Sequence, residues 1–492
     1  DRQFGTAVTL TSLPVELTDV AKQFRVAAGK ALSLKMRDSL NREVAVFWRP
    51  NDLWPLLVKS RRGVAMLVSQ KPQGGWGRPT VALPAGAWAA DEAFLADDGS
   101  SWATDEIGSD RPVLKDLPLK GEANPCPWVG SWWPYAENGI AQQFRPGDLS
   151  PAEKYDRLFN EPAGRKIDAK AMAKMKKVMT EVINPLQTEM EELAKRLNEK
   201  INAGDNSWRE TDLYKKYVEL SKKVQQEESR LNGLFKVDTV TEFEHIYHGD
   251  AVHGLQSWFG HCNAWAASAC IDPEPVKDFT YQGQQFNVGD LKGLLTEAWM
   301  DCASDFIGSR AEAADENNST AYQDVTPSQF QVVFSSYVGQ QERAFVIDRY
   351  TGSEVWNQPI KGFEASVVKE LPVETRNGKK VYPVLMKAKM EWVSDGVAPD
   401  ATNGDPDLPY GEKFHNRVLS YQLDLDKPLK DGGRLLPGGK WLNKMDRNHC
   451  HPDFIWIPTG NLPATPHNNG EYYENPNLDY NKIKKELLPL GI

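Results

Sequence analysis

Cys262 carries the clearest chemical signal in the chain. It follows a turn rich in glycine and aromatic residues, 257–260, and precedes a run of mostly small residues, 264–269, that is typical of a closely packed helix. This order places Cys262 at or near a helix N-terminus, where the helix dipole and unpaired N–H groups stabilise a thiolate and lower the pKa of the thiol. A thiol nucleophile that attacks acyl groups needs this position, with a base and an orienting carboxylate on adjacent strands. The alternative is a buried structural cysteine.

The base and the carboxylate are expected downstream, on two strands. Residues 329–334 and 343–348 both have the composition of β-strands, and a turn between them predicts a hairpin. Asp348 ends the second strand, where an orienting carboxylate belongs, and the base position opposite is occupied by Gln331. A glutamine amide has no useful basicity near neutral pH, so it cannot take the proton of the thiol. It can still hydrogen-bond Cys262 and Asp348 and so preserve the shape of the site.

The string from Val355 to Phe363, Val-Trp-Asn-Gln-Pro-Ile-Lys-Gly-Phe, resembles the elicitor peptide of the oomycete cell-wall transglutaminases. Further segments resemble the same family in the same order, and together they cover roughly residues 125–460: residues 127–134, 150–155, 260–266 and 451–458. The resemblance implies a protein-glutamine γ-glutamyltransferase of the papain-like and transglutaminase-like superfamily, with a Cys-His-Asp triad. It also implies protein substrates that supply glutamine and lysine side chains. Calcium is implied as a stimulating ion, although the acyl transfer itself requires no cofactor.

The resemblance also assigns residues to the site. It matches Cys262 to the nucleophile and Asp348 to the orienting carboxylate, and it puts Gln331 where the family has its histidine. Three residues are expected to contact the substrate, namely Trp258, His261 and Trp356. Three explanations of Gln331 stay open. The protein is a natural pseudoenzyme, it carries an inactivating substitution, or one of the eight histidines at another position acts as the base. The alternatives to an active acyltransferase are a non-catalytic binding module, or a thiol protease or deamidase on the same scaffold.

The cysteine count is five, and an odd number in an oxidising compartment suggests two disulfides and one thiol kept free. Cys262 is the expected free thiol. The other four are expected to form two disulfides: Cys270 with Cys302, and Cys126 with Cys450. This is one of the three connectivities that four cysteines allow.

The expected location is secreted or extracellular, with the periplasm as the alternative. The chain begins at Asp1 rather than Met, which is consistent with a removed N-terminal segment. Asn317 and Asn318 each open a glycosylation sequon.

Two groups of metal-ligand residue types are weak candidates for a metal site. His449, Cys450 and His451 crowd together, whereas zinc sites usually separate paired ligands by two or more residues. The acidic turn at residues 400–407 lacks the spacing and the closing Glu of an EF-hand calcium loop. The metal ligands therefore stay unassigned from the sequence.

Hydrophobic periodicity predicts how the chain is divided. Apolar side chains recur at three- and four-residue steps through residues 166–235, which predicts a helical hairpin kinked or split at Pro185. We expect an α+β fold: a papain-like or transglutaminase-like core with the catalytic helix against an antiparallel sheet, this inserted hairpin, and a small N-terminal α/β or β domain. The predicted segments are 1–120 as an accessory or inhibitory domain that contacts the rest of the chain, 121–165 as a proline- and tryptophan-rich strap and helix, 166–235 as the hairpin, and 236–492 as the catalytic domain.

Length, charge and hydropathy exclude several classes of protein. A chain of 492 residues is too long for one core, so two or three domains are expected. The net charge of −10 argues against a general nucleic-acid-binding protein. No run of eighteen apolar residues occurs, which argues against a membrane-spanning helix.

Overall fold

The computed structural model describes five strands between residues 32 and 83, and then residues 111–203, 207–308, 325–349, 354–442, 451–464 and 474–492. The chain divides into two units, each described by itself. The sheet unit comprises residues 1–127, 303–394 and 410–460, and the helical unit comprises residues 128–302, 395–409 and 461–492. The sequence-predicted segments divide the chain at other points and stay a prediction. Asp1, Asn317, Asn318, His449 and Cys450 lie outside the described residues.

The N-terminal part of the sheet unit is a five-stranded antiparallel sheet whose strands pair in chain order. Its strands are β1 (Leu32–Arg37), β2 (Glu43–Trp48), β3 (Leu56–Ser60), β4 (Ala65–Gln70) and β5 (Trp76–Leu83). This sheet lies within residues 1–120, for which the sequence predicts a small N-terminal domain, and the separate domain stays a prediction.

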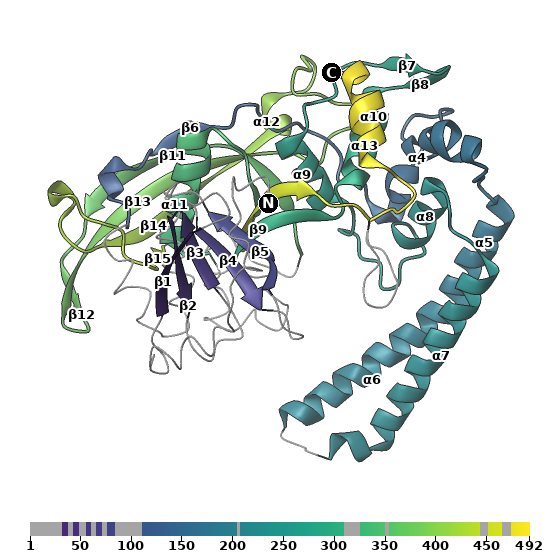
Figure 1. Ribbon diagram of the computed structural model, residues 1–492, viewed down its shortest axis with the longest axis horizontal. Helices are drawn as coiled ribbons and strands as arrows, with labels where there is room; N and C mark the ends of the chain where they lie inside the picture. The colour runs from purple at the N-terminus through teal and green to yellow at the C-terminus, as the bar shows by residue number, and fades with distance from the viewer. Residues whose placement is uncertain are drawn as a thin grey trace. The chain divides into compact units, whose positions relative to one another are not determined.

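The larger part of the sheet unit is a nine-stranded sheet. Seven of its strands have the order β15-β14-β13-β11-β10-β16-β9, and the other two, β12 and β6, pair with β13 and β11. Its strands are β6 (Lys120–Glu122), β9 (Cys302–Gly308), β10 (Val346–Asp348), β11 (Asn357–Glu370), β12 (Glu374–Arg376), β13 (Lys379–Val393), β14 (Phe414–Leu425), β15 (Lys440–Trp441) and β16 (Phe454–Asn461). The long strands β11, β13 and β14 lie side by side and antiparallel (Figure 1). The fold is therefore α+β with an antiparallel sheet, as predicted.

The predicted strand over residues 329–334 is wrong, because these residues form helix α11 (Pro327–Phe334), which continues as a π-helical turn (Ser335–Gln340). Thr326 and Gln329 form a capping box, and Pro327 stands at a first-turn position where its missing N–H costs nothing. The aromatic and β-branched residues of this segment suggested a strand, but they fill the core beneath the sheet as a fully buried helix. A short helix α12 (Tyr410–Lys413) precedes β14.

Among the described residues, the helical unit contains most of the helices and one small β-hairpin. Its α-helices are α4 (Pro151–Tyr155), α5 (Ala169–Val178), α6 (Asn184–Asn202), α7 (Asp212–Leu234), α8 (Val240–Tyr247), α9 (Cys262–Ile271), α10 (Val288–Ala298), α13 (Tyr480–Lys482) and α14 (Leu488–Gly491), and its hairpin joins β7 (Phe279–Tyr281) to β8 (Gln284–Phe286). Ser150 and Glu153 cap α4 with a complete capping box. The core of this unit packs around α10, with Leu291, Leu294 and Leu295 fully buried.

Helices α6 and α7 form the predicted hairpin and run side by side as a long pair (Figure 1). A π-helical segment (Met179–Ile183) immediately precedes Pro185, which is the interruption expected where proline cannot donate to the helix ladder. Thr211 caps α7 by accepting the N–H of Tyr214. The seam between the helices is closed by buried aliphatic side chains: Ile183, Leu193, Leu197, Leu220, Val224 and Leu231.

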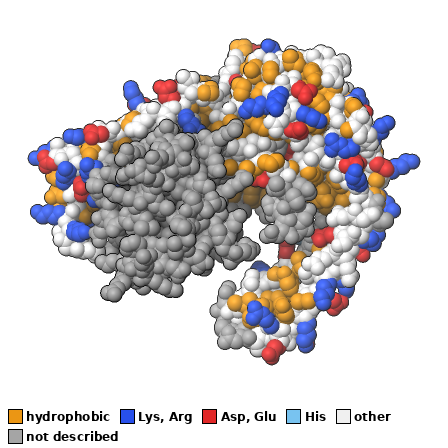
Figure 2. Space-filling model, viewed as in Figure 1, with side chains coloured by type: hydrophobic (Ala, Val, Ile, Leu, Met, Phe, Trp, Pro, Cys, Tyr) orange, Lys and Arg blue, Asp and Glu red, His pale blue; other side chains and the backbone are white. Residues whose placement is uncertain are grey.

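On the face drawn in Figure 2, Lys and Arg side chains are interspersed with Asp and Glu side chains. Ion pairs also form on the hairpin, where Lys216 lies 2.5 Å from Glu189 and Lys223 lies 2.8 Å from Glu219. Within the described parts of the chain, no helix combines the length and apolar character needed to cross a membrane.

Candidate active site

Cys262 is the first residue of α9, as the sequence predicts. The carbonyl of the preceding residue, His261, accepts the first helical hydrogen bond from the N–H of Trp265 at 2.9 Å. Cys262 is 7% exposed, and seven of the ten residues of α9, which packs against α10, are buried. A cysteine here stands where the N–H groups of the first helical turn have no partners further back in the helix. The expected packing of this helix on the antiparallel sheet stays a prediction.

The proline- and tryptophan-rich strap lies across α9. The backbone N–H of His261 donates to the carbonyl of Trp132 at 2.7 Å, which fixes the residue before the helix. At the other end, the indole of Trp128 donates to the carbonyl of Asp272 at 3.2 Å. A side chain at Gly260 would meet the Trp132 carbonyl at 2.6 Å, so only glycine lets the strap approach this closely. The strap therefore holds both ends of the helix that starts at Cys262.

Asp348 ends β10 in the sheet unit and is fully buried. Its Oδ1 accepts the backbone N–H of Trp356 at 3.0 Å, and β10 pairs with β11 so that Asp348 faces Asn357. The elicitor-like string thus enters the sheet as β11. Asn357 accepts the indole N–H of Trp456 at 2.8 Å, and Gln358 is fully buried. These residues of the string are used to build the sheet core.

Gln331 takes its hydrogen bonds inside the sheet unit. Its Nε2 donates to the hydroxyl of Ser335 at 2.9 Å, and its Oε1 accepts the hydroxyl of Tyr421 at 2.6 Å. The side chain is fully buried between α11 and β14. Two hydrogen bonds of this amide are therefore made to core hydroxyls, because the helical conformation of residues 327–334 turns position 331 into the core. Its expected hydrogen bonds to Cys262 and Asp348 stay a prediction.

The three residues expected to contact the substrate lie in different settings. Trp258 is half-buried in the helical unit, where its indole donates to Gln256 at 2.8 Å. Trp356 is half-buried in the sheet unit, with the Arg349 guanidinium 5.1 Å from its ring. Substrate contact by these two tryptophans stays a prediction. His261 is fully buried, and its expected contact with the substrate likewise stays a prediction.

His261 belongs to a buried cluster that the sequence analysis missed. Glu244 and His248, four residues apart at the C-terminal end of α8, converge on His261 together with Glu297 from α10. Burial, followed by the nearby charge of Glu297, raises the pKa of Glu244. Burial raises the pKa of the adjacent Tyr135 to about 12. The Glu-x-x-x-His spacing on a helix was the available signal, because residues four apart share a helix face.

The predicted disulfide between Cys270 and Cys302 is wrong, because Cys302 is a free thiol in the structure. Cys302 starts β9, and burial raises the pKa of its thiol to about 12. The Cys126–Cys450 disulfide stays a prediction, because Cys450 lies outside the described residues.

The acidic turn at residues 400–407 does not fit a calcium site. Asp400 pairs with Arg145 at 2.6 Å, which neutralises the charge that a calcium ion would need. Asn403 accepts the backbone N–H of Val129 at 3.0 Å, and Asp405 accepts that of Asp407 at 2.9 Å. These oxygens support the loop itself. The structure therefore assigns no calcium ligands here.

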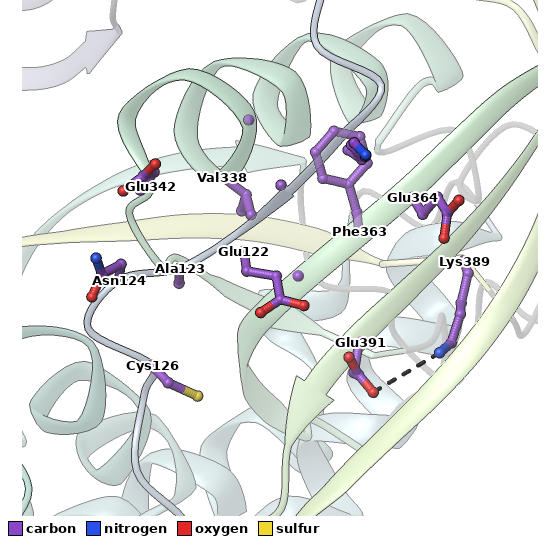
Figure 3. A pocket seen from close by; sticks show the side chains of 14 residues that line it. Glu122, Ala123, Asn124, Cys126, Val338, Glu342, Phe363, Glu364, Lys389 and Glu391 are labelled. Atoms are coloured by element: carbon purple, nitrogen blue, oxygen red, sulfur yellow. Dashed lines mark ion pairs between the residues drawn. The ribbon is translucent and has the colours of Figure 1, made fainter.

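A cavity of about 780 Å³ opens in the sheet unit beside the elicitor-like strand β11 (Figure 3). Its wall is strongly charged, with four glutamates and two lysines: Glu122, Glu342, Glu364, Glu391, Lys120 and Lys389. Lys389 lies 4.0 Å from Glu391, the ion pair drawn in Figure 3. Cys126 is the predicted site residue that lines this cavity. The acidic excess suits a basic ligand better than an apolar one.

Comparison with known proteins gives two matches. A family model described as transglutaminase elicitor matches residues 110–199 and 246–483, which is more than half of the chain. The stretch between the two matches, 200–245, holds the whole of α7. The crystal structure of the GP42 transglutaminase from Phytophthora sojae is similar at 21% identity with a TM-score of 0.48, over 82% of this chain and 97% of that chain. Among curated proteins, none matches the chain.

Proposed function

We propose, since the chain belongs to the transglutaminase elicitor family, that it transfers the acyl group of a protein glutamine to a lysine amine through a thioester on Cys262. The observation that carries this proposal is the position of Cys262 as the first residue of a buried helix held at both ends by the strap. This position supplies a nucleophile together with N–H groups that can stabilise an oxyanion.

The proposed reaction has two halves. The Cys262 sulfur attacks the side-chain carbonyl carbon of glutamine, and ammonia leaves from the tetrahedral intermediate to give the thioester. A lysine amine then attacks the thioester carbon, which releases the thiol and forms the isopeptide bond. Backbone N–H groups in the first turn of α9 stabilise the negative oxygen in both halves. Asp348 is the proposed orienting carboxylate for the base, as the family resemblance implies.

The core position of Gln331 bears on whether the chain is active. Two of the explanations, a natural pseudoenzyme and an inactivating substitution, assume that this glutamine replaces the catalytic histidine. Its amide is instead committed to Ser335 and Tyr421, which supports position 331 as a structural one. The proton acceptor is then one of the histidines, and alanine substitution of each one identifies it.

The test is incorporation of a fluorescent primary amine into a glutamine-rich protein. We expect incorporation by the wild-type chain, and its loss in Cys262→Ala. The matched control is Cys302→Ala, which removes a thiol outside the proposed chemistry. Equal incorporation by Cys262→Ala would sink the proposal, cleavage of the acceptor chain would favour the thiol protease, and release of ammonia without incorporation would favour the deamidase.

Calcium stimulation and export are further proposals that family membership supports. The same assay with added calcium, and with a calcium-selective chelator, tests the first. Detection of the protein outside the cells that make it tests the second. Regulation by the N-terminal domain is tested by comparing the rate before and after proteolytic removal of that domain.

A further inference from the structure

Four ionisable side chains converge in the interior of the helical unit, beside the start of α9. They are Glu244, His248, His261 and Glu297, and their ligand atoms all lie within 4.8 Å of one another. His248 is 3% exposed, and the other three are fully buried. The cluster joins α8 and α10 to the residue that precedes Cys262.

The separations within this cluster are those of ligands around one small ion. His261 Nε2 lies 2.8 Å from Glu297 Oε2 and 3.6 Å from Glu244 Oε2. His248 Nδ1 lies 3.2 Å from His261 Nε2, 3.3 Å from Glu297 Oε2 and 3.4 Å from Glu244 Oε1. A tetrahedral ion with bonds of about 2.0–2.1 Å places its ligands about 3.3–3.4 Å apart. The separations above, 2.8–3.6 Å, lie on both sides of this value, in a set of ligand atoms that are all within 4.8 Å of one another.

The hydrogen bonds around the cluster leave ligand lone pairs directed inward. His261 Nδ1 lies 2.9 Å from the carbonyl of Trp133, and a carbonyl can only accept, so Nδ1 carries the proton. In the neutral ring the lone pair is then on Nε2, which faces the cluster. Glu297 Oε2 is buried and faces both imidazoles, at 2.8 Å from His261 Nε2 and 3.3 Å from His248 Nδ1, whereas its Oε1 accepts the N–H of Asn475 at 2.9 Å. Acceptor atoms therefore meet at a point where a cation would satisfy them.

The surroundings hold the ligands in place. Glu244 accepts the side-chain amide of Asn475 at 3.0 Å and the backbone N–H of Ile140 at 3.3 Å. A Cβ at Gly139 would lie 2.5 Å from the His261 ring and 2.6 Å from a Glu244 oxygen, and the φ of +53° also favours glycine. Outer hydrogen bonds of this kind orient metal ligands and fix their tautomers.

We propose that Glu244, His248, His261 and Glu297 bind one divalent transition-metal ion, with Zn²⁺ the best fit. Two carboxylates and two neutral imidazoles carry a charge of −2, so one dication makes the buried site neutral and removes the cost of uncompensated charge. Two nitrogen and two oxygen ligands suit zinc, whereas calcium takes six to eight oxygens. Four protein ligands close the site, so the ion is structural and ties α8 and α10 to the N-terminus of α9.

The test uses the full-length chain, purified without a polyhistidine tag and without chelators. Mass spectrometry of its elements is expected to find about one zinc per chain, and the X-ray absorption spectrum is expected to show nitrogen and oxygen neighbours without sulfur. Glu297→Gln and His248→Gln are expected to lose the ion. The matched control is His245→Gln, because this neighbour on α8 faces Lys176 at 3.4 Å and lies outside the cluster.

Three results would overturn the proposal. A chain that carries no zinc and takes up none from added zinc chloride would show a hydrogen-bonded network of protonated imidazoles instead. A sulfur neighbour in the spectrum, or equal loss of zinc from His245→Gln, would place the ion elsewhere. The absorption spectrum of the wild-type chain decides the question even if the variants fail to fold. Each of these readouts is independent of acyltransferase activity.

Discussion

At the scale of single residues, Gln331 changes most between sequence and structure. Its amide bonds Ser335 and Tyr421 in a fully buried setting, so Gln331→His leaves at least one core hydroxyl without its partner. We expect a loss of about 1–3 kcal/mol in stability and no gain in amine incorporation. A thermal melt and the incorporation assay measure both effects.

The control for this substitution is Gln341→His, an exposed position just beyond the same helical segment. Its stability should stay within about 0.5 kcal/mol of the wild type. A gain of activity specific to Gln331→His would instead restore the hypothesis that position 331 is the base position.

The thiol of Cys302 predicts an unusual pH dependence of alkylation. Burial raises its pKa to about 12, from an ordinary value of 9.0, so only a very small fraction of the thiol is ionised at pH 9. The alkylation rate of an ordinary thiol levels off above its pKa, whereas the rate of Cys302 should be far lower at pH 9 and keep rising beyond it. Peptide mapping after iodoacetamide treatment at a series of pH values measures this. The same cysteine labelled in urea is the control, and native labelling that is as fast as in urea and levels off at the same pH would contradict the raised pKa.

At the scale of elements, local sequence signals predicted correctly those elements whose structure is determined by neighbouring residues. The start of α9 followed from a glycine- and aromatic-rich turn before small residues, and the strap followed from prolines beside tryptophans. The strand predicted for residues 329–334 was wrong because their β-branched and aromatic composition fits a buried strand and a buried helix equally well. The capping box at Thr326 and Gln329 was the signal that decides between them.

The same capping logic separates two serines that look alike in sequence. Ser150 accepts the N–H of Glu153 and caps α4, whereas Ser207, with Glu210 three residues on, makes no side-chain cap because Thr211 starts α7. Ser150→Ala should therefore cost about 1 kcal/mol and Ser207→Ala only a few tenths. Chemical denaturation followed by circular dichroism checks this. Equal losses in the two variants would contradict the assignment of the caps.

At the scale of the whole molecule, the sequence could not assemble residues that are far apart in the chain. Glu244 and Glu297 stand on different helices, and both are held by Asn475 near the C-terminus. No periodicity links such positions, so tertiary packing alone brings Glu297 and Asn475 to the Glu244–His248 pair. The hydrogen bond from the Tyr421 hydroxyl to Gln331 likewise joins residues that are far apart in the chain. Local patterns named the helix of Cys262, while these long-range contacts define what surrounds it.

The hairpin of α6 and α7 is expected to behave as a cooperative unit of its own. Its apolar cluster, which includes Ile183, Val224 and Leu231, is separate from the core around α10. Leu220 is buried at 5% exposure, so Leu220→Ala should cost about 2–5 kcal/mol locally. Because folding units open separately, hydrogen exchange should accelerate in α6 and α7 and stay unchanged in α9 and α10.

The contrasting variant is Leu294→Ala, which removes a fully buried side chain of α10. It should accelerate exchange in α9 and α10, since these helices pack against each other. Hydrogen exchange resolved by mass spectrometry compares the two variants. Faster exchange in α9 after Leu220→Ala would show that the hairpin supports the helix of Cys262, and the amine assay of that variant should then fall with it. Unchanged exchange and activity would make the hairpin independent of the proposed catalytic machinery.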